Sequence, residues 1–162
     1  MGSGAIAHFP STASPYGVTL NAATALWKAR ARGEDPGDGD LPTETPPFVN
    51  PHFVAAREII TEAFLARGDL EGARTLADAV PDDDWTALMR ASQALLGAWV
   101  ASAEGERGRA EELAWTAAEQ ARTIGATWWL ARALAVIGPS EELAALSAGL
   151  GLSQGNRSPA SS

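Results

Sequence analysis

A glycine-centred unit that occurs twice limits what this chain can fold into. Gly68-Asp69-Leu70, followed by Ala73, recurs as Gly105-Glu106-Arg107, followed by Ala110. Each glycine stands between two stretches of helical periodicity, and Gly138 follows at a similar interval. A glycine in that position is typical of the short turn that joins two packed helices. The unit therefore predicts pairs of helices.

Apolar residues recur at helical spacing over residues 50–150. The stripe before the first glycine consists of Phe53, Ala56, Ile60, Ala63 and Phe64. Residues 126–137 are apolar on more than one side, which predicts a helix packed between others. No segment alternates with period two for long enough to indicate a strand. We therefore expect an all-α fold.

Small residues occupy matched positions after the two glycines. They are Ala73, Ala77, Ala110 and Ala114. Alanine at a helix crossing lets two backbones approach closely, while large groups fill the remaining gap. Alanine makes up about a fifth of the chain, which also holds 6 tryptophans. We expect tryptophan to fill the core volume that alanine leaves, and binding anchors are the alternative interpretation.

This pattern resembles tetratricopeptide-type repeats, with Gly-Asp-Leu at the turn and Ala73 and Ala110 at the crossing. Residues 105–138, GERGRAEELAWTAAEQARTIGATWWLARALAVIG, more specifically resemble the helical repeats of bacterial LuxR-type and related ATP-binding transcriptional regulators. The resemblance implies a short right-handed solenoid of about three helix pairs. The chain departs from the pattern at Gly97 and Ala101, where large residues are usual, and at Leu143, which replaces the crossing alanine.

The chain divides into five regions. We predict a flexible end (1–16), a short helix (17–32), an acidic linker (33–49), a helical repeat domain (50–150) and a disordered tail (151–162). Prolines and glycines in the linker exclude a helix or a central strand there.

Composition narrows the chemistry that is available. A net charge of −8 argues against general binding to nucleic acid backbones. The absence of cysteine excludes disulfides, thiolate metal sites and cysteine catalysis. No stretch approaches the roughly 18–20 apolar residues of a membrane span. We expect a cytoplasmic protein that binds neither nucleic acid nor membrane.

The sequence contains no convincing catalytic or metal-binding pattern. His8 lies in the expected flexible end, and His52 lacks a triad spacing with Asp69 and a serine. The acidic groups of the linker, which do not match a calcium-loop spacing, are Asp35, Asp38, Asp40 and Glu44. Asp82–Asp84 is interpreted as a helix cap. We therefore expect no enzyme activity, no metal and no cofactor.

In tetratricopeptide-like arrays, the first helix of each pair lines a concave groove. The resemblance implies a partner-binding groove formed by Glu58, Glu62, Leu65, Ser92, Leu95, Trp99, Trp128 and Arg132. Trp and Arg are favoured binding anchors. We predict a non-catalytic protein–protein interaction module, a regulatory scaffold whose partner is another protein, a peptide or a second copy. The alternative is a truncated or stand-alone effector-binding region of a LuxR-type regulator, without its ATPase and DNA-binding parts.

Overall fold

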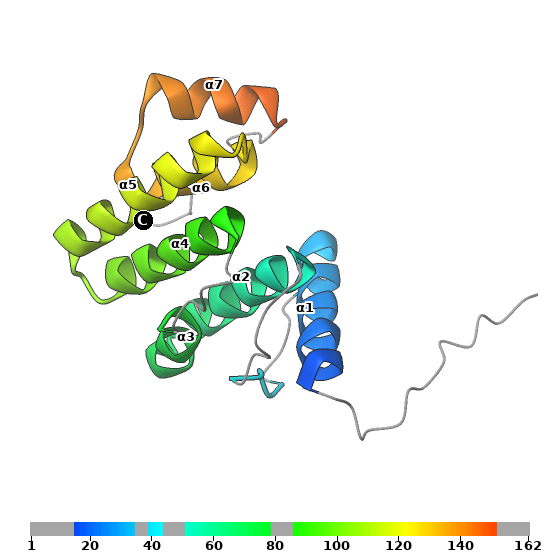
Figure 1. The fold of residues 1–162 in the computed structure, drawn as a ribbon. Coiled ribbons are helices and arrows are strands. Elements are labelled where there is room, and N and C mark those ends of the chain that lie inside the picture. Colours follow the sequence, from blue (N-terminus) through cyan, green and yellow to red (C-terminus); the bar gives the residue numbers. More distant parts are fainter. Residues whose placement is uncertain (1–14, 35–38, 44–50, 79–85, 152–162) are drawn as a thin grey trace, which may run out of the picture.

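The computed structural model of the chain describes residues 15–34, 39–43, 51–78 and 86–151. These residues form seven helices and no strand, so the all-α prediction is confirmed. The helices are α1 (Pro15–Arg32), α2 (Pro51–Ala66), α3 (Leu70–Ala77), α4 (Ala87–Ala103), α5 (Arg107–Thr123), α6 (Thr127–Ile137) and α7 (Glu141–Gly149). Figure 1 shows the helices packed in sequence order, with α1 and α7 at opposite ends of the array.

The first helix starts earlier than expected. α1 begins at Pro15 rather than at residue 17, so the last two residues of the expected flexible end are helical. Proline is favoured at a first helical position, where its fixed φ suits the helix and its missing N–H is not needed. Residues 1–14, most of the expected linker and residues 152–162 lie outside the described part of the chain.

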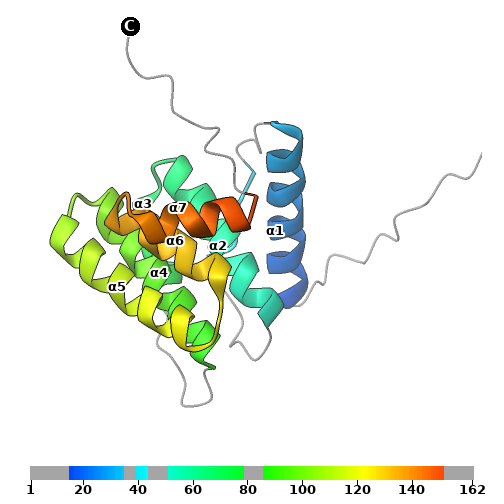
Figure 2. The ribbon, with the colours of Figure 1, turned by 90° about the horizontal axis from the view of Figure 1, so that it is seen from above.

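Helices that are neighbours in sequence pack on one another, and alternate helices meet as well. α3 lies against α2 and α4, and α5 lies against α4 and α6. α2, α4 and α6 also lie side by side in that order. The backbone of α1 lies against α2, and that of α7 against α6, so these two helices cover the ends (Figures 1 and 2).

Three of the connections are the same glycine turn. Gly68, Gly105 and Gly125 have φ of 73°, 79° and 69°, in the left-handed region. After α4, the N–H of Glu106 donates to the Ala101 carbonyl (2.9 Å) and that of Gly105 to the Ser102 carbonyl (3.1 Å). This Schellman arrangement satisfies carbonyls that a helix end leaves open. It recurs after α2 and α5. The repeated glycines Gly68 and Gly105 therefore occur for the same reason: each turn needs a residue in the left-handed region.

Gly138 does not repeat that turn. Its φ of 133° differs from the other three, and its N–H donates to the Leu134 carbonyl at 3.0 Å. The third expected unit thus has a different connection, and the turn that matches the first two lies at Gly125, between α5 and α6.

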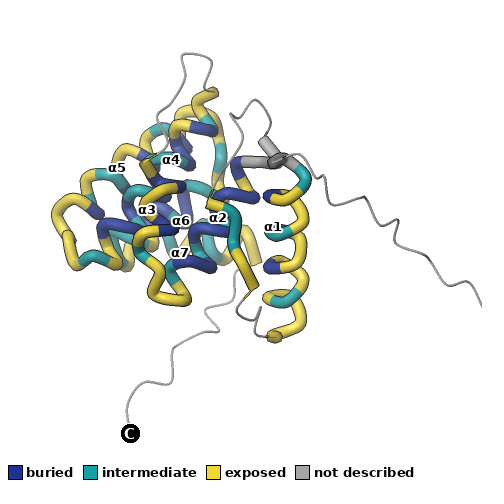
Figure 3. The backbone as a smooth tube through the Cα atoms, turned by 90° about the horizontal axis from the view of Figure 1, so that it is seen from below, coloured by how far each residue is buried: buried dark blue, intermediate teal, exposed yellow. Residues whose placement is uncertain are grey.

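Aliphatic side chains and alanines build the core. One cluster is formed by residues of α1, α2, α3 and α4 and contains Ile60, Phe64, Leu76 and Leu96. A second cluster is formed by α4, α5 and α6, with side chains of α7 packed against it. The crossing alanines Ala73, Ala77, Ala110 and Ala114 are all buried. Figure 3 shows the buried residues on the sides of the helices that face one another, while α1 is largely exposed.

Tryptophan fills this core only in part, through Trp99 and Trp129, which pack against its clusters. Trp99 and Trp129 are half-buried, whereas Trp27, Trp115 and Trp128 are exposed. Trp85 lies outside the described residues. Close approach is achieved instead by small residues: a Cβ placed on Gly72 would come within 2.5 Å of the Phe64 ring.

The glycine turns predict opposite effects for two nearby substitutions. Gly105→Ala forces a side chain into the left-handed region and should lower the free energy of unfolding by about 1 kcal/mol. Gly108 lies inside α5, where an added Cβ would meet open space. Gly108→Ala should therefore raise the free energy of unfolding by about 0.5 kcal/mol, because alanine loses less conformational entropy than glycine when the helix forms. Urea unfolding followed by circular dichroism measures both. Stabilisation by both substitutions would contradict the assigned turn.

Candidate functional site

A buried carboxylate stands out among the polar side chains of this fold. Glu58 of α2 is only 2% exposed. Its Oε1 accepts hydrogen bonds from Ser92 Oγ of α4 and from Trp129 Nε1 of α6, both at 2.5 Å. Its Oε2 accepts from Arg132 Nη1 of α6 at 2.8 Å. One carboxylate therefore joins three helices.

Arg132 is held from several directions at once. Besides bonding to Glu58, its guanidinium donates to Glu62, one turn further along α2. The same group lies 4.3 Å from the ring centroid of Trp99 and 5.5 Å from that of Trp128. Two carboxylates and two aromatic faces thus fix the position of this cation. We call Glu58, Glu62, Ser92, Trp129 and Arg132 the Glu58 network.

Helical spacing explains why these side chains meet. Glu58 and Glu62 are four residues apart on α2, and Trp128 and Arg132 are four apart on α6. Residues at that spacing lie one above the other on the same face of a helix. Trp129 follows Trp128 and turns toward the second core cluster, which leaves its indole N–H directed at Glu58.

Burial raises the pKa of Glu58 above the ordinary value of a glutamate, because the charged form loses its hydration. The hydrogen bond from Ser92, the charge of Arg132 and the bond from Trp129 act in the opposite direction. The neighbouring charge of Glu62 adds to the increase. Desolvation is the largest of these effects.

A second buried cation lies beside this carboxylate in sequence. Burial lowers the pKa of Arg57 to about 10, and the charge of Glu58 partly offsets this. Arg57 Nη2 donates to Gln93 Oε1 of α4 at 2.6 Å and to the Leu76 carbonyl of α3. Gln93 in turn donates to the Ala77 carbonyl. These bonds satisfy the open carbonyls at the end of α3 and favour a cation there.

Two clefts open above the Glu58 network. The first, of about 460 Å³, has Trp27 of α1 and Trp128 of α6 in its walls. The second, of about 470 Å³, is lined by Leu65, Trp99 and other residues of α2, α4 and α6. Arg30 and Glu62 line both clefts. We call these two clefts together the groove.

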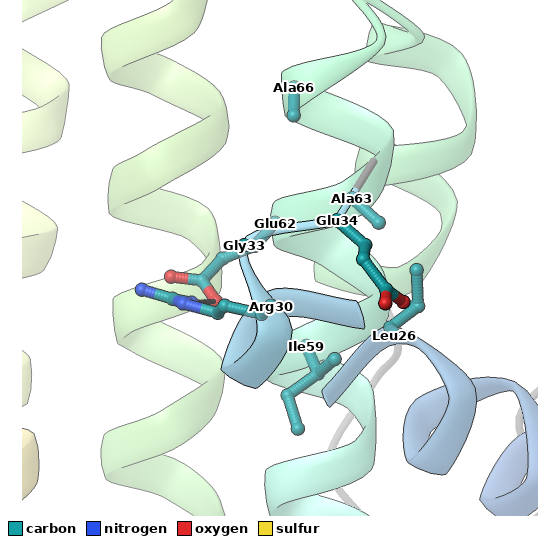
Figure 4. A pocket seen from close by; sticks show the side chains of 8 residues that line it. All are labelled: Leu26, Arg30, Gly33, Glu34, Ile59, Glu62, Ala63 and Ala66. Carbon is teal, nitrogen blue, oxygen red and sulfur yellow. Dashed lines mark hydrogen bonds and ion pairs between the residues drawn. The ribbon is translucent and has the colours of Figure 1, made fainter. Parts of the chain in front are cut away.

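Arg30 and Glu62 form an ion pair inside the groove. Arg30 Nη1, at the end of α1, lies 2.9 Å from Glu62 Oε2. Figure 4 shows the two side chains directed toward one another above Ile59 and beside a third, smaller cleft of about 330 Å³. Glu62 therefore accepts from a cation on each side, Arg30 and Arg132.

Six of the eight residues expected in the groove line its clefts, and a seventh, Ser92, lies behind them, bonded to Glu58. Six of these seven bond, stack or both around Arg132: Glu58, Glu62, Ser92, Trp99, Trp128 and Arg132 itself. Leu65 lines the second cleft. Glu58 and Ser92 are both buried: Glu58 forms the floor of the first cleft, and Ser92 bonds to it without lining either cleft.

Leu95 is the exception, and its expected place in the groove needs correction. It is fully buried in the second core cluster with Ala117, Ala118 and Leu130. α4 packs on α5 and α6 together, so this position of its stripe faces inward. A partner cannot reach it.

Sequence reasoning missed Trp27, Arg30 and Trp129. The adjacency of Trp128 and Trp129 was a usable signal, because neighbours on a helix point about 100° apart and can serve a surface and a core. Nothing in the spacing of α1 indicated that Trp27 and Arg30 would reach the groove, since they meet α2 and α6 only through tertiary packing.

Most of the other candidate residues named from the sequence lie outside the described part of the chain. Within the described ranges, no group of three His, Cys, Asp or Glu side chains is placed to hold a metal ion. Asp40 is exposed, while the other acidic candidates, His8 and the side chain of His52 lie outside the described part. Among the helices that the structure describes, none is both long and apolar enough to cross a membrane.

Comparison of the chain with protein-family models, with curated proteins and with solved structures finds no match. A functional assignment therefore depends on the geometry of the groove and on the chemistry of its side chains.

Removing the cation of the Glu58 network should destabilise the fold strongly. Arg132→Met leaves Glu58 buried without its charge partner, and we expect the free energy of unfolding to fall by about 3 kcal/mol at pH 7. Arg107→Met removes an exposed cation that pairs with Glu111 on the surface of α5, and should change stability little. Urea unfolding of both variants measures the difference. Equal effects would contradict the structural role of Arg132.

The raised pKa of Glu58 predicts a pH dependence. A carboxyl with a higher pKa in the folded than in the unfolded state binds its proton more tightly when folded. Its contribution is therefore present below the unfolded pKa and is lost as pH rises through the folded pKa. The stability of the wild type relative to Glu58→Gln should fall as the pH rises above the ordinary pKa of a glutamate. An increase over that range would mean that Arg132, Ser92 and Trp129 outweigh burial.

Proposed function

We propose that the protein is a non-catalytic binding module whose partner is a peptide segment of another protein. In this proposal α2/α3, α4/α5 and α6/α7 act as three tetratricopeptide-like pairs of a short right-handed solenoid. The groove lies along the first helix of each pair, where such arrays hold their partners. The placement of Trp128 and Arg132 in that groove is the observation that carries the proposal.

The packing order supports the assignment of pairs. Each of α2, α4 and α6 lies against the next member of that series, and α3 and α5 bridge successive members. Neighbour-on-neighbour packing of this kind is what a helical repeat array requires. The matching turns at Gly68 and Gly105 fall inside the first two proposed pairs.

The character of the groove supports binding of a partner. Trp27 and Trp128 leave large apolar faces exposed in its walls. Exposure of such faces is unfavourable in water, and Trp and Arg are the residues that most often dominate binding energy. The Glu58 network below them holds the floor in place, so a partner meets a preformed surface.

A second candidate is the binding of a small effector, as in the effector-binding region of a LuxR-type regulator. The volume of the first cleft, about 460 Å³, favours it, because small-molecule sites span roughly 300–1,000 Å³. Quenching or enhancement of tryptophan emission by a metabolite panel would support this candidate, provided that Trp128→Phe alters the response.

Peptide selection tests the preferred function. A random 12-residue peptide library is selected on the full-length protein, and the affinities of the recovered peptides are measured. Trp128→Ala should weaken binding at least tenfold, since a buried tryptophan anchor contributes about 2 kcal/mol or more. Trp115→Ala is the matched control, because Trp115 on α5 is similarly exposed, 47% against 41%, and does not line the groove.

Each outcome of the selection bears on the proposal. Peptides that bind wild type and Trp115→Ala equally, but Trp128→Ala weakly, support groove binding. Failure to recover any peptide, or equal loss in both variants, would overturn it. Thermal unfolding of the two variants checks that both remain folded.

A further inference from the structure

We infer that Arg30 occupies the place of a partner's arginine, and that the groove binds a peptide through an arginine side chain that displaces Arg30 from Glu62. The inference rests on the proposed function and names the chemistry of the partner. It is carried by the position of the Arg30–Glu62 pair, by its exposure and by the aromatic side chains around it.

The Arg30–Glu62 pair stands where the clefts meet. Both residues line the two clefts of the groove and also the smaller cleft beside α1. A peptide that follows the groove from Trp128 to Leu65 must pass this pair. Arg30 therefore stands between the two clefts of the groove, because it lines both of them.

The two cations on Glu62 are held very differently. Arg132 is mostly buried, bonds to two carboxylates and stacks on two indole rings. The Arg30 side chain is 75% exposed, and its bond to Glu62 is a single one between side chains. Exposed ion pairs contribute about 0–1 kcal/mol. Arg30 can thus leave Glu62 at little cost, while Arg132 stays in place.

Arg30 can move without disturbing the Glu58 network. The backbone of α1 lies against α2 and against no other helix among the described residues. Its buried anchors, Thr19, Ala23 and Leu26, all precede Arg30. Displacement therefore requires only movement of an exposed side chain near the end of α1.

The vacated place suits a guanidinium. A partner's arginine would meet the Glu62 carboxylate in the cleft that Trp27 and Trp128 also line. Arginine combines a charge that bonds to carboxylate with a flat face that stacks on indole. Arg132 already binds in this way, to Glu62 and against Trp99 and Trp128. The same surroundings serve lysine less well, because an ammonium cannot offer a planar fork.

Two substitutions with opposite effects test the displacement. Arg30→Gln removes the competing cation, and peptides recovered from the 12-residue library should bind it about threefold to fivefold more tightly than wild type. Glu62→Gln keeps the size of the side chain and removes its charge, and the same peptides should bind it at least tenfold more weakly. Arg107→Gln is the matched control: its side chain is 87% exposed and pairs with Glu111 at the same 2.9 Å. It should leave affinity unchanged.

The peptides themselves give a second test. Recovered sequences should share an arginine, and replacing it with citrulline, which keeps the shape and loses the charge, should abolish binding. Replacement with lysine should weaken it. Circular dichroism and thermal unfolding confirm that Glu62→Gln remains folded.

The results separate this inference from the proposed function. Peptides that depend on Trp128 but lack a required arginine, or that bind Arg30→Gln more weakly, would overturn the inference and leave groove binding intact. If no peptide is recovered on wild type and none on Arg30→Gln, both this inference and the proposed function are overturned.

Discussion

The bond between Glu58 and Arg132 is the constraint on which the groove depends. It joins α2 to α6, two helices with α4 between them. A buried carboxylate is unfavourable unless charge and hydrogen bonds compensate it. The compensation arrives only when α4 supplies Ser92 and α6 supplies Trp129 and Arg132. The network therefore favours one relative placement of the three helices over others that would bury as much apolar surface.

The local parts of this fold were predictable from the sequence. Gly68 and Gly105 mark turns because the backbone there needs a left-handed residue, whatever packs around it. The pairs Glu58–Glu62 and Trp128–Arg132 were predictable as shared faces, because residues four apart on a helix lie on the same side. Leu95 was misplaced, since a stripe position on α4 can face either the groove or α5, and only packing decides between them. No sequence pattern predicted the pair between Arg30 and Glu62, because it depends on how α1 packs on α2.

The described tryptophans divide between the core and the surface, which composition alone does not predict. An alanine-rich chain has small side chains at its crossings, which suggests that aromatics must supply volume. Here Phe64 and the aliphatic side chains supply much of it, Trp99 and Trp129 pack against the same clusters, and alanine shortens the distances between helices. Trp115 has its ring 5.9 Å from the Arg122 guanidinium on the same helix. Trp27 and Trp128 instead line an open cleft, so their exposed faces remain available for contact.

The last helix is attached more weakly than the others. α7 contains no buried residue, although Leu143 and Leu146 touch the second core cluster. An exposed ion pair adds to this contact: Arg122 donates two hydrogen bonds to the Glu142 carboxylate, at 3.0 and 2.6 Å. Local opening free energy follows buried apolar contact. Amide hydrogens of α7 should therefore exchange with solvent well before those of α4. Detachment of α7 would uncover the apolar side chains of the second core cluster that Leu143 and Leu146 cover, while leaving Arg132 bound to Glu58.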